Sequence, residues 1–109
     1  MKQLVNCTGH PIDIELIDGT FYKVPASGIM VRQHSIDINR VFRIGKIPVS
    51  MSILGDVIGL PQPAEGVIYI VSTMALQALN GSRKDVFAPG ELIRDEKGKV
   101  LGCRGLKQI

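Results

Sequence analysis

The chain has 109 residues, of which 45% are hydrophobic, and a formal net charge of +3. This length fits one domain over residues 1–109, and the hydrophobic fraction excludes an intrinsically disordered protein. No apolar run reaches the roughly 18–20 residues of a membrane-spanning helix, and the first residues lack the apolar run of a signal peptide. We therefore expect a cytoplasmic protein that makes no membrane contact.

The N-terminal stretch predicts a β-hairpin. Residues 12–16 alternate apolar and acidic side chains, which is typical of a half-buried strand. Asp18-Gly19 follows at once and favours a two-residue type I′ turn. A turn of that length would place Leu16 opposite Phe21 as a cross-strand apolar pair.

Strand signals recur along the rest of the chain. We expect further strands at residues 4–7, at 29–33 with a continuation toward 38, and at 47–54. Pro48 should lie at an edge or at the start of its strand, because proline cannot donate a ladder hydrogen bond. The most hydrophobic run, residues 66–71, predicts a strand that is buried on both faces.

A short helix is expected near residues 73–80. Ser72 or Thr73 can cap its start, the residues that follow are good helix formers, and Asn80-Gly81 tolerates the left-handed geometry of a helix end. Further on, Asp95-Glu96-Lys97-Gly98 predicts a bulged hairpin turn in which Gly98 takes a positive φ. The fold class is therefore mainly β (α+β), a small antiparallel barrel or curled sheet with one short helix, since an open sheet of this size would leave exposed edges.

Two arrangements in the sequence have some, but not all, of the features of a metal site or a catalytic site. Cys7-Thr8-Gly9-His10 has the spacing of half a zinc site that Cys103 and His34 would complete, but these two form no second local pair. A buried Cys7 and a turn-forming His10 are the favoured alternative. Cys103 beside Arg104 is the best candidate nucleophile, but no histidine lies near it in the sequence to act as a base.

Motifs of other enzyme classes are also absent from the sequence. It contains no Gly-x-Ser-x-Gly elbow, no Walker loop and no Gly-x-Gly-x-x-Gly motif. We therefore predict no catalytic residues, no metal and no cofactor, and we expect a protein that is not an enzyme. A small cysteine-dependent enzyme remains the third hypothesis for function.

The positive charge gathers in two segments, residues 30–50 and 83–109, each with a net charge of +3. Nucleic acid is a disfavoured partner, because the chain has only two Tyr, three Phe and no Trp to stack on bases. Arginine forks and helix-start hydroxyls suit a small anion instead. The predicted ligand-binding residues are Ser72, Thr73, Arg83, Lys84, Arg94 and Arg104. In the alternative interpretation Ser72 or Thr73 only caps the helix and the arginines are solvated.

Several short motifs, spread over nearly the whole chain, resemble a family of short uncharacterised proteins from bacterial and phage genomes. They are Asn6-x-Thr8-x-His10, Pro25-x-Ser27-Gly28, Gly59-Leu60-Pro61, Tyr69-Ile70-Val71-Ser72, and a tail with Arg83-Lys84-Asp85, Pro89-Gly90, Arg94-Asp95, Gly98 and Gly102-Cys103-Arg104. The phage context of the resemblance and the predicted anion-binding residues together suggest a non-catalytic counter-defence protein that sequesters a small anionic, nucleotide-like ligand, as a homo-oligomer. The alternative is a protein-binding inhibitor of a host defence enzyme.

Overall fold

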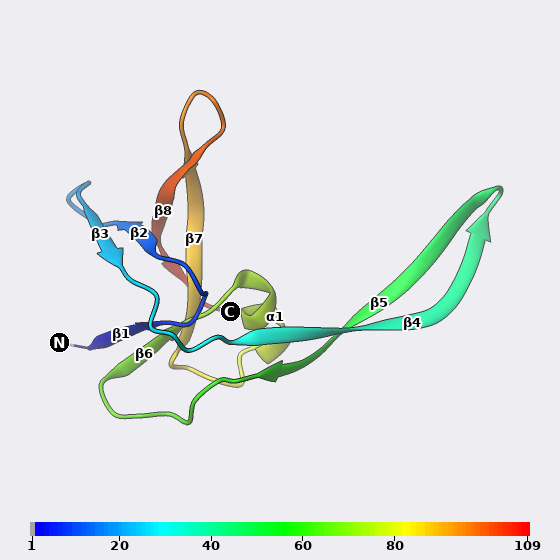
Figure 1. Cartoon of the computed structure of the whole chain (residues 1–109), viewed down its shortest axis with the longest axis horizontal. Coiled ribbons are helices and arrows are strands. Elements are labelled where there is room, and N and C mark those ends of the chain that lie inside the picture. Colours follow the sequence, from blue (N-terminus) through cyan, green and yellow to red (C-terminus); the bar gives the residue numbers. More distant parts are fainter. Residues whose placement is uncertain (1) are drawn as a thin grey trace.

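The computed structural model describes residues 2–109, and its description leaves out the side chains of residues 35–42 and 51–54. Figure 1 shows a β-sheet body from which one long two-stranded arm projects. The elements in chain order are β1 (Gln3–Asn6), β2 (Ile12–Glu15), β3 (Phe21–Val24), β4 (Arg32–Ile44), β5 (Ile47–Ile58), β6 (Val67–Ile70), α1 (Thr73–Leu79), β7 (Val86–Arg94) and β8 (Val100–Lys107).

The body is a nearly closed sheet with the strand order β1-β6-β7-β8-β2-β3. Its two ends meet at a parallel bridge between Asn6 and Ala26, where the Ser27 N–H also donates to the Asn6 carbonyl at 3.0 Å. Closure removes the unpaired edges that an open sheet would expose. The predicted mainly β barrel or curled sheet with one short helix is confirmed. The pairing within it is mixed, because β1–β6, β6–β7 and β2–β8 run parallel.

Strand β6 and the helix α1 that follows it agree with the elements predicted from the sequence. β6 lies between β1 and β7, and its Ile70 is fully buried, as the long apolar run predicted. Ser72 is the N-cap of α1 and its Oγ accepts from the Ala75 N–H at 3.2 Å. Asn80 ends the helix in the left-handed region with a φ of 49°. In the part of the chain that is described, no helix is long and apolar enough to span a bilayer.

The turn of the first hairpin differs from the prediction. β2 and β3 pair Glu15 with Phe21, so the predicted Leu16–Phe21 pair and its two-residue turn are wrong. The loop has three residues, closed by the Leu16 N–H donating to the Thr20 carbonyl at 2.7 Å, with Gly19 at its last position and a φ of 85°. A glycine there forms a bulge after an ordinary turn, which serves a hairpin as well as the type I′ turn does.

The second hairpin, β7–β8, has the bulged turn that was predicted. The Asp95 N–H donates to the Lys99 carbonyl at 2.9 Å, and Gly98 has a φ of 81°. The Asp95 carboxylate also accepts from the Lys97 and Lys99 N–H groups at 2.9 Å each. The same loop length thus closes both hairpins of the body.

Two hydrophobic clusters form the core. The larger lies between the sheet and α1 and includes Cys7, Val31, Tyr69, Val71, Ala75, Leu76, Val86 and Ala88. The smaller lies inside the curl of the sheet and comprises Ile12, Ile14, Val24, Ile70 and Cys103. The two cysteines are free and occupy different clusters.

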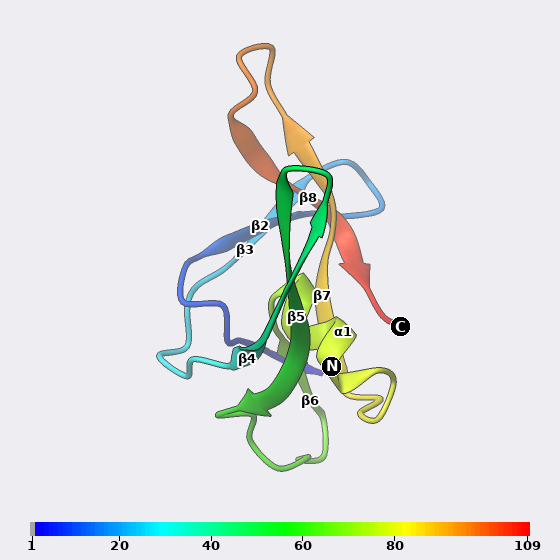
Figure 2. The same cartoon turned by 90° about the vertical axis from the view of Figure 1, so that its right-hand side faces the viewer.

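The arm is the antiparallel ribbon β4–β5, which lies in front of the body in Figure 2. It joins the two strands predicted at residues 29–38 and 47–54 into one hairpin of 13 and 12 residues. At its tip Ile44 pairs with Ile47 around Gly45 and Lys46. Pro48 is the second residue of β5, in a two-stranded sheet where both strands are edges, as expected for proline.

Candidate ligand-binding site

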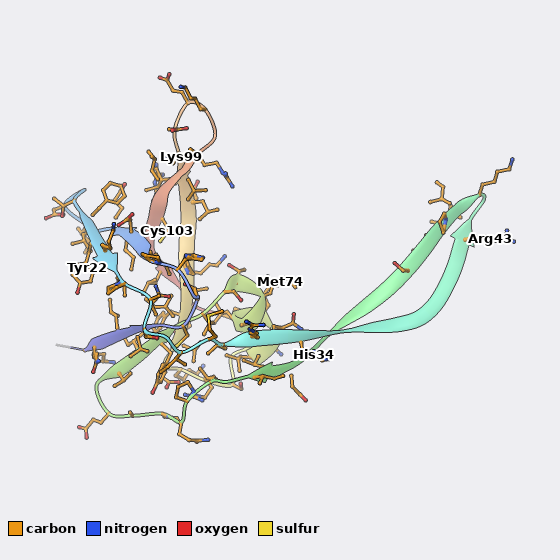
Figure 3. The ribbon with its side chains drawn as sticks, in the orientation of Figure 1. Tyr22, His34, Arg43, Met74, Lys99 and Cys103 are labelled. Atoms are coloured by element: carbon orange, nitrogen blue, oxygen red, sulfur yellow. The ribbon has the colours of Figure 1, made fainter. Side chains whose placement is uncertain are left out.

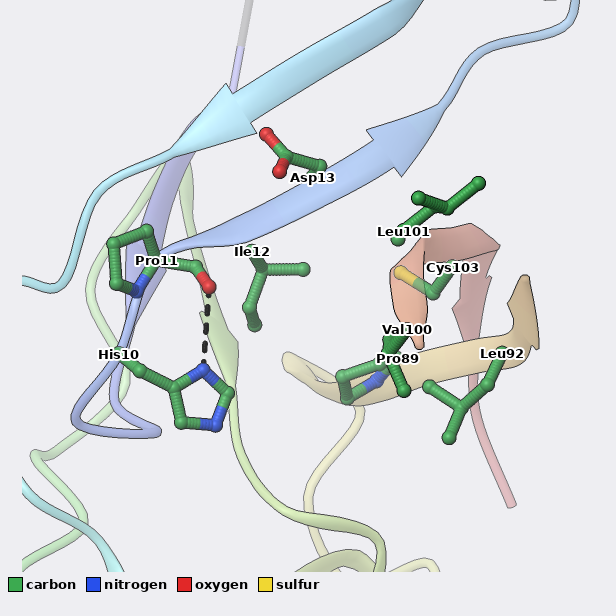
Figure 4. Close-up of a pocket in the computed structure, with 10 residues that line it drawn as sticks. His10, Pro11, Ile12, Asp13, Pro89, Leu92, Val100, Leu101 and Cys103 are labelled. Carbon is green, nitrogen blue, oxygen red and sulfur yellow. Dashed lines mark hydrogen bonds between the residues drawn. The ribbon is translucent and has the colours of Figure 1, made fainter. Parts of the chain in front are cut away.

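Two adjacent hollows lie where the β1–β2 loop, the start of α1 and the β7–β8 hairpin meet. The apolar hollow, about 470 Å³, is shown in Figure 4 and is lined by His10, Pro11, Ile12, Asp13, Pro89, Leu92, Val100, Leu101, Gly102 and Cys103. The second hollow, about 450 Å³, is called the polar hollow because hydroxyl and charged side chains contribute to its wall; it is lined by Thr8, His10, Ser72, Thr73, Pro89, Gly90, Glu91, Leu92 and Lys107. Most of the lining surface of both hollows is apolar. The hollows share His10, Pro89 and Leu92 and so adjoin each other, and together they are called the groove.

Asn6 holds the β1–β2 loop that forms one wall of this groove. Its side chain is buried, with 1% exposure, and its Nδ2 donates to the His10 carbonyl at 2.7 Å and to the Val24 carbonyl at 3.1 Å. Its Oδ1 accepts from the Thr8 N–H at 3.0 Å and from the Thr8 hydroxyl at 2.6 Å. A buried amide with all these bonds made fixes the loop around it. The motif Asn6-x-Thr8-x-His10 therefore positions Thr8 and His10 at the groove.

His10 stands where the two hollows join. Its Nδ1 lies 3.2 Å from the Pro11 carbonyl, a contact drawn in Figure 4. A carbonyl only accepts, so Nδ1 is the donor where this contact is a hydrogen bond. The imidazole thus offers both an aromatic surface and a polar atom to a molecule in the groove.

The polar hollow contains two of the predicted ligand-binding residues, Ser72 and Thr73. The Ser72 oxygen is already engaged as the helix cap. The positive charge in this hollow comes from Lys107, near the end of β8, and Glu91 on β7 faces it with a carboxylate. Sequence reasoning missed Lys107, whose signal was the excess of positive charge in the C-terminal tail.

Arg83 lies outside both hollows, in an ion pair. Its Nε and Nη2 donate to the two carboxylate oxygens of Asp85 at 2.9 Å each, and Nη2 also donates to the Pro61 carbonyl at 3.0 Å. This hydrogen bonding holds the pKa of Asp85 below its usual range. The side chains are only 20% and 22% exposed. The pair fastens the loop before β6 to the segment that leads into β7.

Arg94, Arg104 and Lys84 also lie outside the two hollows, and the structure does not bring them together with Ser72 and Thr73. Arg94 donates to the Gly98 carbonyl at 2.9 Å, at the tip of the β7–β8 hairpin. Arg104 lies 3.8 Å from Glu91 in an exposed ion pair. That these cations and Arg83 contact a ligand stays a prediction.

The two thiols are poorly placed for chemistry. Cys103 lines the apolar hollow but is only 1% exposed, and its Sγ donates to the Gly105 carbonyl at 3.4 Å. Burial raises the pKa of Cys103 and of Cys7, which disfavours the thiolate that acts as nucleophile or metal ligand. Among the described residues, no three His, Cys, Asp or Glu side chains gather as a metal site.

Comparisons with known proteins add no assignment. No family model matches the chain, and the comparisons with curated proteins and with solved structures find no similar protein. The chemistry of the groove is therefore the basis for assigning a function.

Proposed function

We propose that the protein binds a small anionic, nucleotide-like ligand in the groove without transforming it. The observation that carries this proposal is that a hollow lined mainly by apolar residues adjoins one whose wall includes hydroxyl and charged side chains, through the shared residues His10, Pro89 and Leu92. Each volume, about 470 and 450 Å³, falls in the range of small-molecule sites. A nucleotide has the matching division into a flat, weakly polar base and a charged, hydroxyl-rich remainder.

The chemistry of each hollow suggests how such a ligand lies. The base would pack against Leu92 and Leu101 and the imidazole of His10 in the apolar hollow. The phosphate would pair with the Lys107 ammonium and the Thr73 hydroxyl, since charge-assisted hydrogen bonds are the stronger class. Glu91 suits ribose hydroxyls, which donate to carboxylates in other nucleotide sites. The net charge of +3 favours the approach of an anion.

A binding role without catalysis is part of the same proposal. The buried thiols of Cys7 and Cys103, with their raised pKa values, support it against the cysteine-dependent enzyme. Sequestration of a nucleotide signal in phage counter-defence is the biological role that the sequence resemblance implies, and it needs a pocket but no catalytic group.

A protein-binding inhibitor of a host enzyme is the second candidate. The exposed apolar residues of the arm favour it, because Ile44, Ile47 and Ile58 are each about 60% exposed. Retention of one host enzyme by the immobilised full chain, together with inhibition of that enzyme, would support this candidate.

The decisive experiment is a thermal-shift screen of cyclic and linear nucleotides on the full chain. A ligand at a hundredfold its dissociation constant should add about 2.7 kcal/mol to the free energy of unfolding. No shift across the panel would refute the proposed function and leave the inhibitor as the leading candidate.

Variants then test the place of binding by calorimetry. We expect Lys107→Gln to weaken binding of a screened ligand about tenfold, which corresponds to the roughly 1.4 kcal/mol of one charged hydrogen bond. Lys97→Gln is the matched control, because Lys97 is exposed in the β7–β8 turn and lines neither hollow. Equal affinity of both variants and the wild type would show that the ligand binds elsewhere.

A further inference from the structure

The arm contacts α1 through both of its strands, and Val57 packs against the larger core cluster, while the outer half of the arm extends away from the body (Figure 1). A two-stranded ribbon standing alone is marginally stable in water and needs a further strand or a packed surface. At its tip the paired residues Ile44 and Ile47 are each 63% exposed. The tip therefore presents an apolar surface that another surface would have to cover.

The charge of the arm's outer half narrows what can cover it. Residues 38–55 include Arg40, Arg43 and Lys46 but no carboxylate. Arg43 and Lys46 flank the exposed isoleucines at the tip, and Figure 3 shows Arg43 at the far end of the arm. A surface that covers the arm tip should therefore be apolar and acidic.

The β2–β3 hairpin of the same protein has that composition. Residues 12–24 contain Asp13, Glu15 and Asp18 against a single cation, Lys23, which lies opposite Asp13 in the β2–β3 ladder. The hairpin also exposes large apolar side chains, namely Leu16 at 43%, Ile17 at 110%, Phe21 at 50% and Tyr22 at 48%. The positive charge of the arm's outer half thus has a counterpart in the net negative charge of an apolar hairpin.

The two surfaces cannot meet within one copy. Figure 1 shows the arm tip and the β2–β3 hairpin on opposite sides of the molecule, and Figure 3 labels Arg43 on the one and Tyr22 on the other. The molecule is 54 Å long. We propose that the arm tip of one copy docks on the β2–β3 hairpin of a second copy. Apolar contact supplies the attraction, and the opposite charges select the partner and its orientation.

A charge-reversal pair tests this contact in the full-length chain by analytical ultracentrifugation. The wild type should sediment as a multiple of its 11.9 kDa chain mass. Lys46→Glu alone and Glu15→Lys alone should each raise the dissociation constant at least about tenfold, because like charges then face each other. The combined variant should recover most of the lost affinity.

Two controls separate docking from misfolding and from general charge effects. Lys97→Glu makes the same charge change in the exposed β7–β8 turn and should associate like the wild type. The double variant Ile44→Ser and Ile47→Ser should also dissociate the assembly, while the melting temperature of the body stays unchanged. A monomeric wild type would overturn the proposal, as would single reversals without effect or a combined variant without recovery. A monomer whose arm binds and inhibits a host enzyme would assign the arm to that partner.

Discussion

Replacing Asn6 should reveal how strongly the β1–β2 loop depends on one buried amide. Asn6→Ala removes both the donors that reach the His10 and Val24 carbonyls and the acceptor for the Thr8 N–H and hydroxyl. Asn6→Asp keeps the shape and the acceptor but turns the donating nitrogen into a second oxygen. It then sets a carboxylate against two carbonyl oxygens.

The structure gives the size of the effect. The His10 carbonyl keeps the Thr8 hydroxyl as a donor at 3.1 Å, so the Val24 carbonyl, on a residue only 4% exposed, is the group that loses its amide partner. A buried unsatisfied group costs about 1–3 kcal/mol, and the Thr8 N–H adds a smaller cost. Asn6→Ala should therefore lower the free energy of unfolding by about 2–4 kcal/mol. At about 4 °C per kcal/mol, the melting temperature should fall by at least about 8 °C.

For Asn6→Asp the loss of unfolding free energy should also depend on pH, which gives a sharper test. Burial and the facing carbonyls raise the pKa of the introduced carboxyl in the folded state above its unfolded value of about 3.9. The variant should therefore lie closest to the wild type below about pH 4. Its deficit in stability should grow as the pH rises through the folded pKa.

Urea unfolding of both variants between pH 3 and 8 measures these differences. Gln77→Glu makes the same amide-to-carboxyl change on the exposed face of α1 and should shift stability by less than about 0.5 kcal/mol. An Asn6→Ala variant as stable as the wild type, or an Asn6→Asp deficit that shrinks with rising pH, would refute the assigned role of the amide.

The arginines give two further predictions that separate fold from binding. Arg83→Ala should cost about 1.5–3 kcal/mol of unfolding free energy, measured in urea, because it breaks a partly buried, charge-assisted pair. In the wild type the lowered pKa of Asp85 contributes stability above about pH 4 that is lost as the pH falls through the folded pKa, and Arg83→Ala should weaken this acid dependence. Arg104→Ala should leave the melting temperature nearly unchanged, because its pair with Glu91 is 3.8 Å long and exposed. It should weaken anion binding in calorimetry, because the Glu91 carboxylate that lines the polar hollow then loses its paired cation. A large loss of stability would instead make Arg104 a structural residue, and unchanged affinity would remove it from the predicted site.

The sequence predicted the elements whose signals are local. The helix followed from Ser72 before good helix formers and from Asn80 after them, and both residues cap α1 as expected. Gly98 marked its turn because only a positive φ closes that loop. The turn of the β2–β3 hairpin was predicted wrongly because its local signal is ambiguous. Asp18-Gly19 fits both a two-residue and a three-residue loop, and the choice depends on the Leu16–Thr20 hydrogen bond.

Local sequence patterns could not predict the arm or the groove. The residues of β4 and β5 have the pattern of any strands, and nothing in that pattern says that they pair only with each other outside the body. The groove draws its residues from four separate stretches of chain, residues 8–13, 72–73, 89–92 and 100–107. Ser72 and Thr73 were predicted from the helix start, whereas Lys107 enters the site only because β8 pairs with β7.

Part of the groove is formed by glycines at which neighbouring strands approach closely. These positions cannot carry a side chain that would discriminate between ligands. A Cβ on Gly90 would collide with the Arg104 carbonyl, and one on Gly102 would lie 2.6 Å from the Asp13 carbonyl. Gly90 lines the polar hollow and Gly102 the apolar one, so both hollows depend on strands that approach too closely for a side chain. A ligand therefore meets a rigid floor, and differences in affinity between ligands should come from the side chains of Thr8, Leu101 and Lys107 at its walls.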